Sequence, residues 1–152
     1  MALPNIFEEK VIYNVIQRIN KLAPSTQRQW GKMDVAQMLA HCCVPYEMVY
    51  ENNHAKPNAF MRWILKRLVK DLVVNEIPYP KNNRTAPAFL IKGERDFEKE
   101  KARLVGYIIR TQELGESHFD SKESNSFGNL TITEWNNMFY KHLDHHLTQF
   151  GA

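Results

Sequence analysis

The chain has 152 residues, of which 43% are hydrophobic and 24% charged, and its formal net charge is +3 at pH 7. This composition excludes the disordered and collagen-like classes, and the length suits one domain with a sizeable core. Nucleic-acid-binding proteins concentrate basic charge far more strongly, so we expect no nucleic-acid partner.

The sequence carries no targeting signal that we recognise. The first residues, MALPNIFEEKVIYNV, lack a basic segment followed by an apolar run, which argues against a signal peptide. No stretch approaches the ~18 apolar residues of a membrane-spanning helix. The two cysteines, Cys42 and Cys43, are adjacent, and neighbouring cysteines rarely form a structural disulfide. We therefore expect a protein of the reducing cytoplasm.

The first half of the chain predicts two long helices and a shorter one. A helix over about residues 5–22 would begin at Asn5 as N-cap and bury an apolar stripe at helical spacing. The second would begin after Asp34, another good N-cap, and must end before Pro57. A shorter helix is predicted over residues 59–74, followed by an irregular loop over residues 75–94. Loops of this length inside a compact domain are usually functional or disordered.

The second half predicts two more long helices and no strand. One begins at Asp96 and ends at Leu114, because Gly115 suits the position that follows a helix. Residues 116–129 are expected to form a loop. The segment TITE is a capping box formed by Thr131 and Glu134, and it begins a helix that runs to residue 151. The predicted fold class is therefore all-α, a four-helix bundle.

Three of the six histidines lie close together in the segment KHLDHHLTQFGA, on the last predicted helix. On a helical wheel, His142 and His146 fall in the middle of the buried stripe, and His145 lies at its edge. Asp144 and Asn137 are expected to face solvent on the opposite side. The stripe itself is marked by three bulky residues, Trp135, Met138 and Phe139.

Two histidines in a core stripe need partners, because unpaired buried polar groups are costly. A shared metal ion is one explanation, since side chains four residues apart lie one turn apart and Zn, Ni and Fe all accept imidazole nitrogen. The other is a pair of core histidines that bond to carboxylates, tyrosine hydroxyls or water. Leu143 follows His142, so the HExxH motif is absent and metal-dependent proteolysis is not expected.

A metal site would need a third ligand, and His41 on the second helix is the candidate. The wheel places His41 about 100° from the centre of that helix's apolar stripe, at the boundary of the buried face. Pro45 leaves the carbonyl of His41 without its helical partner and should kink the helix, which can turn His41 inward. An incidental kink in a buried helix is the alternative.

Three segments resemble the DinB-like superfamily of metal-binding four-helix bundles, in a branch described as a domain of unknown function. They are DVAQMLAHC on the second helix, DFEKEKARL on the third and KHLDHHLTQFG on the fourth. The resemblance implies a single DinB-like helical-bundle domain over residues 1–152, with a long crossover that contains an extra short helix. It also implies that His41, His142 and His146 bind a divalent metal, with Gln149 just after the last ligand. The segment ESNSFGN lacks a His-Pro pair that this branch tends to carry, which puts the substrate in doubt.

Characterised members of the superfamily include transferases and isomerases that use low-molecular-weight thiols. The resemblance therefore implies a metal-dependent enzyme that transfers or adds a thiol to a small electrophile, with Zn, Ni or Fe as the ion. The alternative is a non-catalytic bundle that binds a metal or a ligand. We identify no catalytic base, because Glu47 is predicted on the polar side of its helix and Cys42 in the core.

The segment MRWILKRLVK alternates basic and apolar side chains, as do helices that lie on anionic membranes. The commoner explanation is a helix whose apolar side packs on the bundle or on a second subunit while its lysines face water. We therefore expect no membrane partner, and we expect the protein to form a homodimer. The expected substrate is a small molecule.

Overall fold

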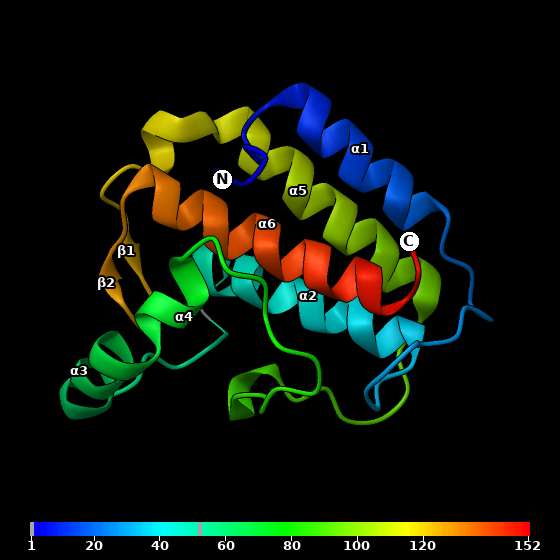
Figure 1. The fold of residues 1–152 in the computed structure, drawn as a ribbon, viewed down its shortest axis with the longest axis horizontal. Helices are drawn as coiled ribbons and strands as arrows, with labels where there is room; N and C mark the ends of the chain where they lie inside the picture. Colours follow the sequence, from blue (N-terminus) through cyan, green and yellow to red (C-terminus); the bar gives the residue numbers. More distant parts are fainter. Residues whose placement is uncertain (1, 52) are drawn as a thin grey trace.

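Four long helices pack side by side in the computed structural model, which describes residues 2–51 and 53–152 (Figure 1). α2 contacts both α5 and α6, and α1 also contacts α5 and α6. The four helices are α1 (Glu9–Asn20), α2 (Val35–Tyr50), α5 (Phe97–Phe119) and α6 (Ile132–Gln149). This arrangement confirms the predicted all-α bundle.

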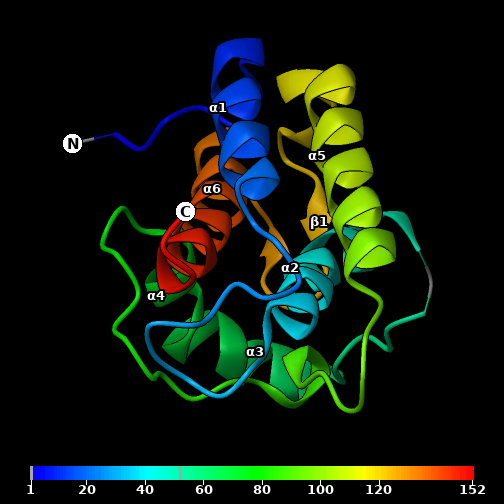
Figure 2. The ribbon, with the colours of Figure 1, turned by 90° about the vertical axis from the view of Figure 1, so that its right-hand side faces the viewer.

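α2 is buried on almost every side, because α5, α6 and the crossover all cover it (Figure 2). Asp34 caps its first turn by accepting a hydrogen bond from the Gln37 N–H at 2.8 Å. The helix continues through Pro45 without a break. A helix buried all round has no boundary between an apolar and a polar face. The prediction that Glu47 lies on a polar side is therefore wrong, and His41 is buried rather than marginal, at 4% exposure.

The crossover between α2 and α5 contains three short helices rather than one. They are α3 (Ala59–Leu68), α4 (Lys70–Val74) and the 3-10 helix η1 (Pro87–Phe89). The predicted helix over residues 59–74 is divided at Val69, where φ is −117°. The crossover lies on the α2 and α6 side of the bundle, away from α1 (Figures 1 and 2).

Two polar residues of α6 attach the crossover to the bundle. Asn137 donates from Nδ2 to the Val74 carbonyl at 2.9 Å. Lys141 donates from Nζ to the carbonyls of Leu72 and Asn75 at 2.8 and 2.7 Å, and to the side-chain oxygen of Asn75 at 2.9 Å. These bonds satisfy carbonyls at the end of α4 that have no partner within the helix. The prediction that Asn137 faces solvent is wrong, because α4 covers this side of α6 and leaves Asn137 4% exposed.

α1 begins later than predicted. Its first residue is Glu9, and Asn5 instead forms a turn in which its side-chain oxygen accepts from the Phe7 N–H at 3.1 Å. Ile6 and Phe7 are buried by this turn. The predicted capping box of α6 is confirmed by the reciprocal bonds between Thr131 and Glu134.

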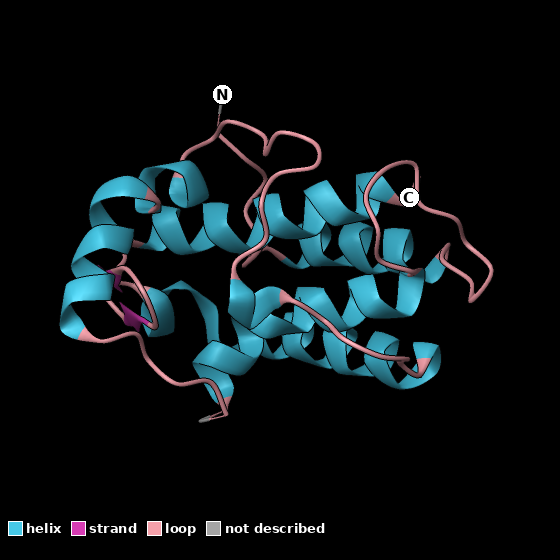
Figure 3. Ribbon diagram, turned by 90° about the horizontal axis from the view of Figure 1, so that it is seen from below, coloured by secondary structure: helices cyan, strands magenta, loops and turns pink. Residues whose placement is uncertain are grey.

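The segment after residue 114 is more ordered than the predicted loop. Gly115 interrupts the helix with φ +71°, but the helical chain resumes and ends at Phe119. Phe119 is fully buried, and its ring lies against the rings of Phe7, Trp135 and Phe139. A two-residue antiparallel hairpin follows, formed by β1 (Glu123–Ser124) and β2 (Gly128–Asn129) (Figure 3). Strands of this length are too short to show an alternating pattern.

No helix within the described residues is long and apolar enough to cross a membrane. α3 exposes several apolar side chains, with Phe60 at 70%, Trp63 at 59% and Leu68 at 76%. Its Arg62 forms an ion pair with Glu123 of the hairpin. The homodimer and the absence of a membrane partner stay predictions.

We expect Lys141→Met to destabilise the protein, because three acceptors at the end of α4 would lose their buried donor. The free energy of unfolding should fall by about 2–3 kcal/mol. Urea denaturation followed by circular dichroism measures this change. Lys10→Met, at an exposed position of α1, is the matched control. Equal stabilities for both variants would contradict the anchoring role of Lys141.

Candidate metal centre

Three histidine rings from two helices meet beneath the crossover. His41 comes from α2, and His142 and His146 come from successive turns of α6. Their ligand atoms all lie within 4.8 Å of one another. The ring centroids are 4.4 Å apart for His41 and His146, 4.9 Å for His41 and His142, and 4.8 Å for His142 and His146. The structure thus brings together the three residues that the sequence singled out.

Hydrogen bonds at Nδ1 orient two of these rings. Nδ1 of His41 lies 2.8 Å from the carbonyl oxygen of Phe89, and Nδ1 of His146 lies 2.8 Å from Oε1 of Gln149. The Gln149 amide is itself held, since its Nε2 donates to the Trp30 carbonyl at 2.8 Å. Both partners are acceptors, so each Nδ1 carries the proton and each Nε2 keeps its lone pair. Metal-binding histidines are commonly oriented in this way.

The donor set fits a divalent metal ion. Nε2 of His41 and Nε2 of His142 are 3.0 Å apart. Two nitrogens that share a tetrahedral zinc ion at ~2.0–2.1 Å would be roughly 3.3 Å apart. Within residues 2–51 and 53–152, this is the only group of three or more metal-ligating side chains with such proximity. To hold an ion, the His41 and His142 nitrogens would move slightly apart, and any pair near the 4.8 Å limit would move closer.

The three rings are neutral at ordinary pH. Burial lowers the pKa of His142 well below its usual value, and the neighbouring histidines lower it further. Burial and the neighbouring His41 lower the pKa of His146 to about 3, although Gln149 opposes this shift. Burial also lowers the pKa of His41, against the effect of its bond to Phe89. Neutral imidazole is the form that binds metal.

Phe89 of η1 covers the triad. Its ring centroid lies 5.5 Å from that of His41 and 5.8 Å from that of His142. The same residue supplies the carbonyl that orients His41. Sequence analysis missed Phe89, because residues 75–94 carry no motif. The only signal was the length of that segment.

The loop before α2 is fastened to the end of α6 through Gln149. The Gln149 carbonyl accepts from the Gln29 N–H at 2.8 Å, in addition to the bond between its side chain and Trp30. Gly31 permits this approach, because its φ is +84° and a Cβ there would lie 2.5 Å from Nε2 of Gln149. The resemblance implied a glutamine, Gln149, shortly after the last ligand, and the structure gives it a contact with His146.

Cys42 and the other three histidines lie outside the triad. Cys42 is 1% exposed, as predicted, and burial raises the pKa of its thiol well above the usual value. His54 instead contacts Glu47, and His118 is exposed beside Lys122. His145 is half-buried, with its ring centroid 5.0 Å from that of His146. It lines a cavity of about 190 Å³ on that side of the triad.

The fold and the site define a helical bundle with a buried three-histidine cluster under its crossover. A family model described as Protein of unknown function (DUF1569) matches residues 9–152, so the chain belongs to this family. The match confirms the expectation of a family of unknown function. No curated protein and no solved structure matches the chain. The wider resemblance to the DinB-like superfamily stays a prediction.

We expect Gln149→Leu to weaken metal binding, because His146 would lose the acceptor that fixes its proton on Nδ1. Loss of such a partner typically reduces metal affinity about 10–100-fold. Competition with a chromophoric chelator measures the zinc affinity, and nitrogen chemical shifts of His146 report the tautomer without metal. Gln17→Leu, at an exposed position of α1, should leave both readouts unchanged. An unchanged tautomer in Gln149→Leu would contradict this assignment.

Stability of the metal-free protein should fall as the pH is lowered from about 6.5, the usual pKa of histidine. In the unfolded chain His146 binds a proton near that pH, whereas the folded state keeps it neutral until about pH 3. The unfolded state therefore binds more protons in this range, and each such histidine contributes up to about 1.4 kcal/mol per pH unit. Urea denaturation at several pH values gives the free energy of unfolding as a function of pH. This free energy should change less with pH in His146→Leu than in the wild type. An equal pH dependence in both proteins would refute the lowered pKa of His146.

Proposed function

We propose that the protein is a metal-dependent enzyme of the DinB-like type, in which His41, His142 and His146 hold one divalent ion. The observation that carries the proposal is the pair of Nδ1 bonds, to Phe89 and Gln149, which leaves a lone pair on Nε2 of His41 and His146 that can bind a metal ion. Zn, Ni and Fe all suit three imidazoles. Three protein ligands leave coordination positions open, which is typical of catalytic rather than structural sites.

We further propose the transfer or addition of a low-molecular-weight thiol to a small electrophile. When bound, a divalent ion would supply Lewis acidity, which lowers the pKa of a thiol or water and polarises an electrophile. The chain contributes burial, because His41 and His146 are 4% and 8% exposed and Phe89 packs on His41 and His142. Cys42 and Cys43 are not the reacting thiols in this proposal, since both are buried and held protonated by raised pKa values.

A non-catalytic metal-binding protein is the second candidate. The two cavities found beside the triad are lined by residues other than His41, His142 and His146. Phe89 packs against two of the three rings and narrows the approach to them. A site that stays closed around its ion would suit binding or storage rather than turnover.

We also propose a cytoplasmic location for this activity. Both cysteines are free and buried. Unbridged thiols are the usual state in a reducing compartment, where low-molecular-weight thiols are also kept reduced.

The first experiment is elemental mass spectrometry on untagged protein, after incubation with Zn, Ni or Fe. We expect about one metal ion per chain in the wild type, and loss of the ion in His142→Ala and His146→Ala. His118→Ala, at an exposed position, should retain the metal. Failure of the wild type to bind any of these ions would overturn the metal site.

An activity test then separates the two candidates. The metal-loaded protein is incubated with a low-molecular-weight thiol and a small electrophile, and loss of free thiol is followed with time. Turnover that disappears in His142→Ala supports the enzyme. Full metal occupancy without turnover for a panel of thiols and electrophiles supports the binding protein instead.

A further inference from the structure

A second cavity, of about 470 Å³, lies between α2, α5 and the segment 88–96 that connects η1 to α5. We call it the charged cavity. Segment 88–91 separates it from the triad, since Phe89 contacts the histidines while its neighbours line the cavity. Its volume falls within the range of small-molecule sites, roughly 300–1,000 Å³. One part of its lining is apolar and is formed by Ala40, Val44, Ala88, Leu90 and Ile91.

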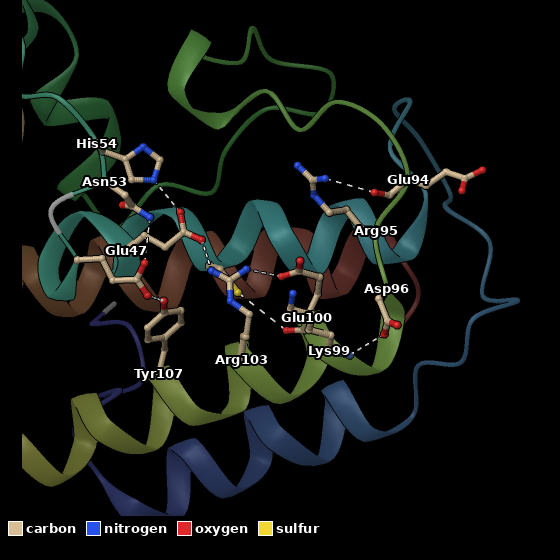
Figure 4. A network of polar contacts seen from close by, with 12 residues as sticks. Glu47, Asn53, His54, Glu94, Arg95, Asp96, Lys99, Glu100, Arg103 and Tyr107 are labelled. Atoms are coloured by element: carbon tan, nitrogen blue, oxygen red, sulfur yellow. Dashed lines mark hydrogen bonds and ion pairs between the residues drawn. The ribbon is translucent and has the colours of Figure 1, made fainter.

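The opposite part of the charged cavity holds two buried carboxylates joined by one guanidinium (Figure 4). Arg103 donates to Glu47 and to Glu100, at 2.5 Å in each case. Glu47 and Glu100 are 9% and 6% exposed. The second oxygen of Glu47 lies 2.6 Å from Nε2 of His54. The second oxygen of Glu100, Oε1, has no hydrogen-bond partner among the described residues.

The charges around the cavity leave one negative charge in excess. At the rim, Glu94 and Asp96 are balanced by Arg95 and Lys99. In the buried part, two carboxylates face the single guanidinium of Arg103. Oε1 of Glu100 is not a fully buried atom, so it lies open to the cavity and not to the core. A positively charged occupant would offset the excess negative charge there.

A metal ion does not account for this arrangement. The carboxylates of Glu47 and Glu100 and the ring of His54 do not form a group of mutually close ligand atoms, unlike the triad, within the described chain. An occupant with a cationic head and an apolar body fits better. Its N–H groups can form charge-assisted bonds to Glu100, which are roughly twice as strong as neutral ones. Its body can lie on the apolar lining.

We propose that the charged cavity binds a small organic cation, such as an amine, amidine or guanidine, with Oε1 of Glu100 as its main acceptor. This site is separate from the triad and does not depend on the function proposed for it. An amidinium N–H can bond to Oε1 while Oε2 of Glu100 stays bonded to Arg103, and Val44 and Leu90 supply apolar surface for a ring.

Three probes of nearly equal shape test the charge preference. Benzamidine is cationic, benzamide is neutral and benzoate is anionic. Isothermal titration calorimetry should give benzamidine a Kd of about 1 mM or lower, as expected for a ligand of this size. Benzamide should bind at least about tenfold more weakly, and benzoate should show no binding. Equal binding of benzoate, or no binding of benzamidine, would overturn the proposal.

Variants locate the probe. Glu100→Gln keeps the shape of the side chain but removes its charge, and should weaken benzamidine by about tenfold or more. Glu98→Gln, exposed on the same helix and outside the cavity lining, is the matched control and should bind as the wild type does. Ala88→Trp fills the cavity from its exposed wall and should abolish binding without disturbing the core.

A last variant separates the charged cavity from the triad. His142→Ala removes a central triad residue and should leave the affinity for benzamidine unchanged. Loss of benzamidine binding in His142→Ala, together with normal binding in Glu100→Gln, would place the probe at the triad and refute the charged cavity as its site.

Discussion

The burial of α2 on almost every side is the constraint on which both candidate sites depend. Polar groups on such a helix need partners inside the protein, and among the described residues the Tyr46 hydroxyl of α2 is the one fully buried side-chain group without a partner. His41 meets the other two histidines and the carbonyl of Phe89. Glu47, less than two turns further on, meets Arg103 and His54. One buried helix thus explains why two polar clusters lie within a core that is otherwise apolar.

The crossover supplies what the bundle alone lacks. The four long helices alone would leave His41 and His142 open on the α2 and α6 side. The anchoring of α4 by Asn137 and Lys141 brings the chain back over that side, and η1 then places Phe89 on the two rings. Polar residues of α6 therefore have two roles. Lys141 and Asn137 hold the crossover in place, and His142 and His146 form part of the triad that the crossover covers.

Local signals in the sequence predicted much of the fold and part of the site. Caps such as Asp34 and Thr131 act within one turn, so they can be recognised from the sequence without knowledge of the tertiary structure. The buried stripe that contains His142 and His146 can likewise be recognised from the helical spacing of its residues. The burial of His41 cannot be recognised in this way, because it depends on a crossover segment about 48 residues away in the chain. Phe89 could not be predicted for the same reason, since its position follows from the path of an irregular loop.

Segment 88–91 joins the two sites mechanically. Phe89 packs against the triad and orients His41, while Ala88 and Leu90 line the charged cavity. No histidine of the triad lines the charged cavity, so the two sites share the backbone of this segment but no side chain.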